Sequence, residues 1–452
     1  MLKKIITLSL CTCFVSLNSF AQSLPEVLAE AYKTNPILKS SKNVLKSVDE
    51  DVAIAKSGYR PTLDINGSLA YQSIDSYSEK VTSNDDSLEI VAKQSLFSGL
   101  STYNSVKSAK FASKASTNDF YNTEQSLLFS ASDAYLNVLK NQAVVKLQKN
   151  NEELLKKELD ETLKRFEVGE VTRTDVSQAK ASHAEAIADT IKAKGELDVV
   201  KAEYERVVGF EPQTLEEPTF ISALTPASLD DALLFAKENN FYIRQAKNNY
   251  LSKSYNVASN AGALLPSLSL EASANRVNSG TNVDYDGDIR TDSLEVGLNL
   301  NVPIYDAGLN RATLRQSKYK KAAAADDIIV ATRQAVADTI SAFEVMNSSK
   351  AQLEAIDAQI EANRLALDGV QKEEELGNRT LLNVLDAYQD LLNSEVSKEI
   401  AKEEYYSSAL DLLVSMGKLT ASDLQLDVDV YNPGESYKKT QNKWISTSVN
   451  KD

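Results

Sequence analysis

The chain has very few of the residues that cross-link or punctuate small globular proteins. Its 452 residues include two cysteines, one histidine and one tryptophan, with 15 glycines and 9 prolines. Both cysteines, Cys11 and Cys13, lie in residues 1–21, where a basic start, an apolar stretch and the sequence Ser19-Phe20-Ala21 have the pattern of a signal peptide with its cleavage site. We therefore expect an exported mature chain that begins at Gln22 and has no disulfide.

Long apolar runs and excess positive charge are missing as well. After the expected signal peptide, no run approaches the roughly 20 apolar residues that a membrane-spanning helix requires. Any part of the mature chain that lies in a membrane must then consist of strands. The signal peptide holds two lysines and no acids, so the mature formal charge is −15 − 2 = −17. This charge argues against a nucleic-acid partner and against a polybasic lipid-binding surface.

Residue patterns that carry catalysis are also missing. The sequence contains no phosphate-binding loop, no cluster with metal-ligand spacing and no nucleophile–base set. Its one histidine, His183, stands in a helical pattern, where a lone histidine is usually structural. We expect no enzymatic activity, no cofactor and no metal.

The most informative feature that is present is an internal duplication. The segment Phe166–Val176 returns as Glu374–Val384, and its Gly169 and Gly377 differ by 377 − 169 = 208 positions. Pairs elsewhere keep the same offset, so we interpret the chain as two copies of one unit. The expected division is a first repeat at 22–210, a linker at 211–227, a second repeat at 228–420 and a C-terminal tail at 421–452.

Each repeat is expected to contain two strands after a pair of helices. Alternation with period 2 predicts strands at about 62–73 and 87–97 in the first repeat, and at about 267–275 and 293–303 in the second. One face of each strand is apolar and the other is polar. A soluble, half-buried sheet and a membrane barrel both show this pattern.

About a hundred residues in each repeat then have a helical pattern. The stretch from Ser101 to Val168 has no proline, and as one helix it would span on the order of 100 Å. Turns are expected at Gly169 and Gly377, because glycine accepts backbone angles that other residues resist. A series of mostly apolar or small residues from Val176 to Val207, which includes His183 and Thr190, steps alternately by 3 and 4. This period indicates helices wrapped around neighbours, although an ordinary bundle also fits.

Four strands in one chain cannot close a barrel, and open sheet edges do not face lipid. Several chains would have to share one barrel: two would supply eight strands, and three would supply twelve with room for water. The long helices would continue from the barrel as a tube.

This order of elements resembles the TolC family of outer-membrane efflux and secretion channels, over nearly the whole mature chain. The motifs that carry the resemblance are Phe166-x-Val168-Gly169-x-x-x-x-Thr174-Asp175-Val176 and Gly377-x-Arg379-Thr380-x-x-Asn383-Val384-Leu385-Asp386, supported by Ser95–Gly99, Leu265–Pro266 and Val302–Gly308.

The resemblance implies an α+β membrane protein. Each half would give two strands to a trimeric 12-stranded barrel in the bacterial outer membrane, and the helical hairpins would form a periplasmic α-barrel closed at its tip. It implies a passive exit duct for tripartite efflux or type I secretion. Its expected partners are two further copies of the chain, a periplasmic adaptor (membrane fusion) protein, an inner-membrane RND or ABC transporter and outer-membrane lipid.

The resemblance also implies roles for residues at the hairpin tips. Asp175 and Arg379, with Thr174, match positions that help to latch the tunnel entrance shut. Asn383 and Asp386 match two acidic positions that ring the entrance, so one ring here would be neutral. Glu374 stands where some relatives carry an aromatic residue that assists the latch. The adaptor would dock at Val168, Gly169, Leu376 and Gly377.

A different class of protein remains open at this point. A periplasmic or surface coiled-coil protein with a small soluble sheet, and no channel activity, would share the long helices. An adaptor protein is disfavoured, because adaptors have one hairpin inserted in small β-domains rather than two hairpins in tandem. The exported substrate and the class of pump do not follow from the sequence.

Overall fold

The computed structural model describes residues 22–449, apart from 76, 78–79, 219–220, 222–223 and 282–288. The expected signal peptide therefore lies outside the described residues. The elements are α1 (Leu24–Thr34), α2 (Pro36–Ser57), β1 (Thr62–Asp75), β2 (Lys80–Ser98), α3 (Ser101–Glu167), α4 (Arg173–Val208), α5 (Leu229–Asn239), α6 (Phe241–Gly262), β3 (Ser267–Thr281), β4 (Ile289–Asn301), α7 (Leu309–Glu375), α8 (Leu381–Met416) and α9 (Pro433–Thr440).

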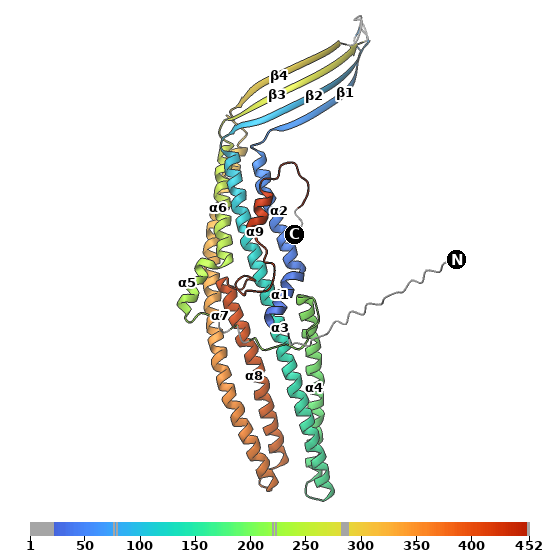
Figure 1. Cartoon of the computed structure of the whole chain (residues 1–452), viewed down its shortest axis with the longest axis vertical. Helices are drawn as coiled ribbons and strands as arrows, with labels where there is room; N and C mark the ends of the chain where they lie inside the picture. The colour runs from blue at the N-terminus through green and yellow to red at the C-terminus, as the bar shows by residue number, and fades with distance from the viewer. Residues whose placement is uncertain are drawn as a thin grey trace, which may run out of the picture.

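The two repeats have the same element order and nearly the same element lengths. The long helices α3 and α7 have 67 residues each, and α4 and α8 have 36 each. Figure 1 shows one elongated body, with the sheet at one end and both helical hairpins reaching to the other end. None of the helices in the described ranges is both long and apolar enough to cross a bilayer.

Equivalent asparagines interrupt the helices in both repeats. Asn35, between α1 and α2, accepts from the Ile37 amide and donates to the Val207 carbonyl, both at 2.8 Å. Asn240, between α5 and α6, accepts from the Tyr242 amide and donates to Ser415 in the same way. Each asparagine caps one helix and ties it to the end of a helical hairpin.

The four strands form one antiparallel sheet in the order β1-β2-β3-β4. All four are as long as or longer than the sequence ranges suggested, and β2 and β3 extend furthest into the expected loops. Within the sheet, β1 pairs only with β2 and β4 only with β3, so the outer edges of β1 and β4 have no partner strand in the described chain.

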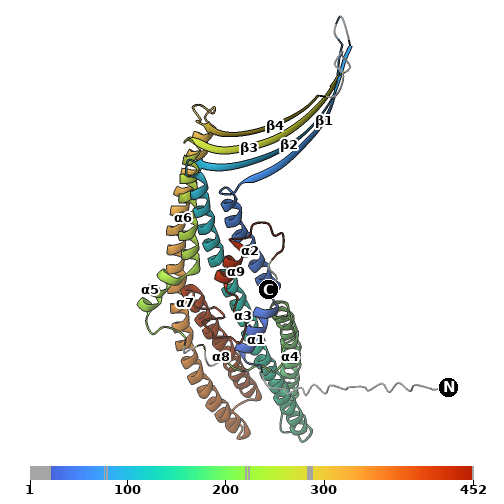
Figure 2. The same ribbon diagram turned by 45° about the horizontal axis from the view of Figure 1, so that its top comes forward.

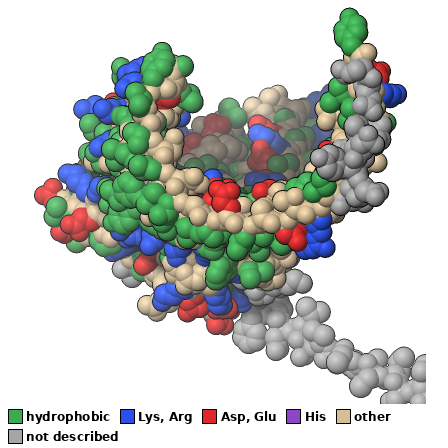
Figure 3. Space-filling view, turned by 90° about the horizontal axis from the view of Figure 1, so that it is seen from above, with side chains coloured by type: hydrophobic (Ala, Val, Ile, Leu, Met, Phe, Trp, Pro, Cys, Tyr) green, Lys and Arg blue, Asp and Glu red, His purple; other side chains and the backbone are tan. Residues whose placement is uncertain are grey.

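The pairing register places the apolar sets of all four strands on one face. Ile65 lies opposite Ile90, Ile90 opposite Ala274, and Ala274 opposite Leu294. The sheet is strongly curved (Figure 2), and hydrophobic side chains gather on its convex side, whereas acidic and uncharged polar ones face its concave side (Figure 3). The other face carries hydrogen-bonded polar pairs such as Asn66–Glu89 and Asn299–Glu271. The predicted one-sided strands are therefore confirmed.

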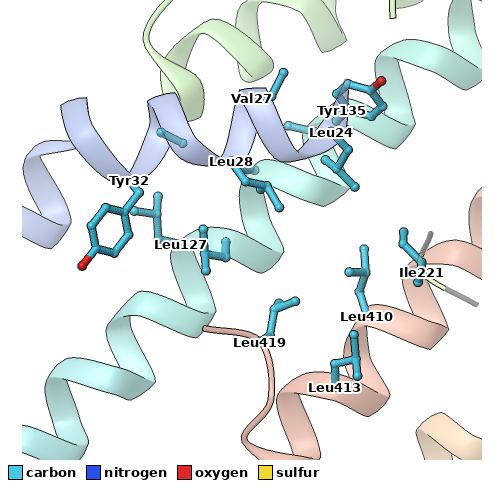
Figure 4. Packing of buried hydrophobic residues seen from close by; sticks show 14 of the residues in the cluster. Leu24, Val27, Leu28, Tyr32, Leu127, Tyr135, Ile221, Leu410, Leu413 and Leu419 are labelled. Atoms are coloured by element: carbon cyan, nitrogen blue, oxygen red, sulfur yellow. The ribbon is translucent and has the colours of Figure 1, made fainter. Parts of the chain in front are cut away.

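The main core lies at mid-length, far from the sheet. Leu28 of α1, Leu128 and Tyr135 of α3, and Leu410 and Leu413 of α8 are fully or almost fully buried there. Figure 4 shows α1 crossing α3 at this point, with Leu410, Leu413 and Leu419 nearby. The Tyr135 hydroxyl lies 2.8 Å from the Gln22 carbonyl and accepts from the Glu216 amide, so it ties the linker to the core.

Candidate functional site

The two hairpin tips lie together at the end of the molecule opposite the sheet (Figure 1). Gly169 and Gly377 turn the chain with φ of +81° and +77°, in the left-handed region that favours glycine. The predicted glycine turns are confirmed. Next to them, Val168 and Leu376 are 70% and 76% exposed, so each tip presents an apolar side chain to its surroundings.

Each returning helix begins with a capping box. Thr172 caps α4, and the Asp175 carboxylate accepts from the Thr172 amide and hydroxyl, both at 2.8 Å. Thr380 caps α8, and the Asn383 side chain accepts from its amide and hydroxyl at 3.3 and 3.0 Å. Asp175 and Asn383 are thus the same position of the two repeats, although the family resemblance gave them different roles, and both stabilise a helix start.

The expected pair of Asp175 and Arg379 does not form within one chain. Arg379 Nε instead donates to Glu373 Oε2 at 2.8 Å, and both side chains are about half exposed. Asp175 is engaged by Thr172, and Thr174 beside it is exposed. An exposed ion pair such as Arg379–Glu373 contributes roughly 0–1 kcal/mol, so this guanidinium can exchange partners at little cost.

A different ion pair joins the two hairpins inside one chain. Arg165 of α3 lies 2.9 Å from Glu374 of α7, and its side chain is 30% exposed while that of Glu374 is 14% exposed. Glu170 of the first tip lies 3.7 Å from the same guanidinium. The family resemblance marks Glu374 only as the loss of an aromatic contact. No local pattern signals its pairing with a residue of the other hairpin.

A small apolar cluster lies behind this ion pair. It brings together Leu155 of α3, Ala179 and Ala186 of α4, and Leu381 and Leu385 of α8. The alanines belong to the predicted helix seam, and they allow the backbones to approach closely. Through this cluster α8 also contacts the first hairpin near the tip.

An open cleft of about 560 Å³ lies between α3 and the second hairpin, lined by Glu158, Glu161, Arg165, Glu374 and Tyr388 among others. Burial raises the pKa of Glu158, and the carboxylates of Glu161 and Glu374 raise it further, whereas Arg165 opposes them. Tyr388 accepts a hydrogen bond from the Gln371 side chain on the same hairpin. The contact between the hairpins is therefore polar and charge-dependent on one side and apolar on the other.

One face of α8 carries acidic side chains past the tip. Asp386 is exposed, and Asp390, one turn further along, is exposed as well. Asn383, Asp386 and Asp390 fall at i, i+3 and i+7, which share one side of a helix. The family resemblance predicts an entrance role for the first two positions but not for Asp390.

Comparisons with known proteins place this architecture in a family. A sequence model described as outer membrane efflux protein matches residues 27–208 and 235–418, which are the two repeats. The outer membrane efflux protein BepC of Brucella suis is 34% identical over 434 residues, covering 94% of this chain and 92% of that protein. The outer membrane protein TolC of Escherichia coli is 26% identical and covers 90% and 84% of the two chains.

Solved structures show the same fold. The Campylobacter jejuni CmeC outer membrane channel superposes with a TM-score of 0.77 at 17% identity, covering 93% of this chain and 89% of that one. The outer-membrane channel OprN superposes with a TM-score of 0.75 over 87% and 89%. Duplicated repeats, a sheet apolar on its convex side and paired hairpins define a channel of the outer membrane that extends into the periplasm. The chain belongs to the outer membrane efflux protein family, the TolC-type channels, as the resemblance in the sequence suggested.

Proposed function

We propose that three copies of this chain close into one passive exit duct, which works with a periplasmic adaptor and an inner-membrane pump in tripartite efflux or type I secretion. The observation that carries this proposal is the sheet: it has four strands, one apolar face and unpaired outer edges at β1 and β4. Unpaired edges are not tolerated in hydrocarbon, so β4 of one copy must pair with β1 of the next.

The two edge strands fit one another. They have 14 and 13 residues, and in a closed meander they run antiparallel. Three copies give twelve strands, enough for a water-filled barrel whose polar concave face lines the lumen. The resulting tube would continue through the helices to the tips.

The tips supply the gate in this proposal. The Arg165–Glu374 pair holds the two hairpins of one copy together, and Arg379 of one copy pairs with Asp175 of a neighbour beside Thr174. Weak, partly exposed pairs suit a gate, because each costs little to break while a ring of them closes cooperatively. The acid face of α8, with Asp386 and Asp390, lines the entrance and attracts cations.

The exposed apolar tips, Val168–Gly169 and Leu376–Gly377, are the proposed adaptor docking points. Relatives include the alkaline protease secretion protein AprF of Pseudomonas aeruginosa and the probable efflux pump outer membrane protein TtgC of Pseudomonas putida. Because a secretion protein and an efflux protein both occur among the relatives, the pump rather than the duct selects the cargo.

Engineered disulfides test the shared barrel directly, because the mature chain expected from Gln22 onward has no cysteine. Leu63→Cys near the start of β1 and Leu300→Cys near the end of β4 lie on opposite edges of one sheet, so a disulfide between them must join two chains. Cysteines at neighbouring β4 positions would first be scanned to find the one that lies opposite Leu63→Cys in the next chain. With that pair, we expect oxidised outer membranes to yield covalent dimers and trimers.

The single variant Leu63→Cys is the control and should remain monomeric on denaturing gels. Purified trimers should conduct ions in planar bilayers. Release of the unmodified protein by osmotic shock as a soluble rod would refute the duct and favour the structural coiled-coil protein.

A further inference from the structure

Positive charge is concentrated at one level of this acidic protein. The segments 52–61, 101–118 and 436–449 contain no Asp or Glu at all. They are the end of α2, the start of α3, and α9 with the tail that follows it. Their cations are Lys56, Arg60, Lys107, Lys110, Lys114, Lys438, Lys439 and Lys443.

The fold brings these three segments together. Lys56 of α2 donates to the Gln441 carbonyl and to the Asn442 side chain, both at 3.1 Å, although 385 positions separate Lys56 from Gln441. Burial lowers the pKa of Lys56, and the neighbouring charges of Lys110 and Arg60 lower it further. Within the described residues, no ion pair joins any of these eight cations to a carboxylate.

Next to this basic cluster, the tail carries exposed apolar side chains. The Arg60 guanidinium lies 5.4 Å from the centre of the Trp444 ring and donates to the Lys443 carbonyl at 3.3 Å. Trp444 is 68% exposed and Ile445 is 87% exposed. A cation–π contact and two hydrogen-bonded anchors therefore hold the tail in place while Trp444 and Ile445 stay largely exposed.

The position of Trp444 coincides with the lower border of the apolar sheet face. Arg60 is two residues before β1, and Leu63, the first apolar residue of that face, is 69% exposed. Figure 1 shows α9 alongside α2, with the tail rising toward the start of β1. In a barrel this is the level of the lipid headgroups, where tryptophan and basic side chains concentrate.

We propose that the tail 436–449, with the basic ends of α2 and α3, binds anionic phospholipid headgroups of the periplasmic leaflet. Trp444 and Ile445 insert at the headgroup level, and the lysines attract the phosphates. The inference rests on the proposed barrel for the position of the lipid. The mature-chain charge of −17 argued against such a surface, but it averages over acidic segments elsewhere, and local charge governs binding within a Debye length.

Trp444 is the only tryptophan of the chain, so its fluorescence reports on this one position. The full-length trimer would be placed in phosphatidylcholine nanodiscs, with and without phosphatidylglycerol, each containing lipids brominated near the headgroup end of the acyl chain. We expect a blue-shifted emission that the brominated lipid strongly quenches, with more quenching when phosphatidylglycerol is present.

The triple variant Lys438→Gln/Lys439→Gln/Lys443→Gln keeps Trp444 and should lose the extra quenching. The matched control Lys146→Gln/Lys180→Gln/Lys194→Gln removes three exposed lysines far from the sheet and should keep it. The Trp444→Phe variant measures the background fluorescence of the tyrosines.

Emission that is water-like and not quenched by bromine would overturn the proposal. Blue-shifted emission without bromine quenching would also overturn it, because a neighbouring chain would then cover Trp444. Quenching that is independent of phosphatidylglycerol and of the three lysines would overturn the role of anionic lipid. Trimers on gels and conductance from the same preparations test the barrel separately, so the two failures are distinguishable.

Discussion

Arg165 and Glu374 are 209 positions apart in the sequence, but their side chains lie 2.9 Å apart and connect the two hairpins. They stand at the repeat-related tips of α3 and α7, just before each chain reversal. Gate opening in the proposed duct requires the hairpins to separate here, so this contact opposes opening.

Breaking this pair should favour the open gate. For Arg165→Gln we expect the open probability in planar bilayers to rise by about 5-fold, since the loss of about 1 kcal/mol shifts an equilibrium by that factor. The charge-swapped double variant Arg165→Glu/Glu374→Arg should restore closure. Glu170→Gln is the control, because Glu170 is 63% exposed and 3.7 Å away. Unchanged gating in Arg165→Gln would remove this pair from the gate.

Asn383→Asp should strengthen block by multivalent cations. In the proposed trimer the change adds an acidic ring at the entrance, and an aspartate at this position can still close the capping box with Thr380, as Asp175 does with Thr172. Single-channel recordings with a trivalent cation measure the effect. Asp386→Asn and Asp390→Asn should each weaken the block. If Asn383→Asp and the unmodified channel were blocked equally, α8 would not present this face to the lumen.

Glu124 should make stability depend on pH. It is 1% exposed on α3, and one carboxylate oxygen accepts from the Ala421 amide at 2.7 Å while the other has no partner. Burial raises its pKa to about 7; the Asp423 charge adds to this, whereas the hydrogen bond from Ala421 and the Lys42 charge oppose it. The folded state then binds this proton more tightly than the unfolded state, so stability falls as pH rises from the unfolded value through 7.

Glu124→Gln should remove that loss. We expect the variant to unfold at a higher temperature than the unmodified protein at pH 8, by an amount corresponding to roughly 3 kcal/mol, since the pKa rises from 4.5 to about 7 and each unit is worth about 1.4 kcal/mol. At pH 4 the two proteins should unfold at the same temperature. The exposed Glu435→Gln on α9 is the control, with no expected change between the two pH values. A Gln variant that is less stable at pH 8 would contradict this prediction.

The helix-break asparagines should be costly to replace. Asn35→Ala removes a cap and leaves the buried Val207 carbonyl without its donor, which should destabilise the chain by about 2 kcal/mol. Asn240→Ala should act alike through Ser415. Thermal unfolding checks both, with Asn260→Ala, a more exposed asparagine bonded to Asn256, as the control. Equal stability of Asn35→Ala and Asn260→Ala would show that the tie to α4 contributes little.

Much of the architecture was predictable because its signals are local. Alternation in Leu63–Tyr71 marks a strand with one apolar face, and Gly169 and Gly377 mark turns because their backbone angles suit glycine. The caps at Thr172 and Thr380 follow from neighbouring residues as well. The contacts at the proposed gate were less predictable: Asp175 was expected to pair with Arg379, and within one chain each instead bonds a residue close to it in sequence.

The sequence alone determined the duplication, the strand faces and the helix breaks, because each depends on side-chain periodicity or backbone preference over a few residues. Only the tertiary structure decided that Arg165 meets Glu374 and that Lys56 and Arg60 hold the tail beside the sheet. Such contacts depend on the crossing and rotation of helices dozens of residues long. Small changes in helix direction and rotation accumulate along those helices, and a short sequence pattern does not specify the result.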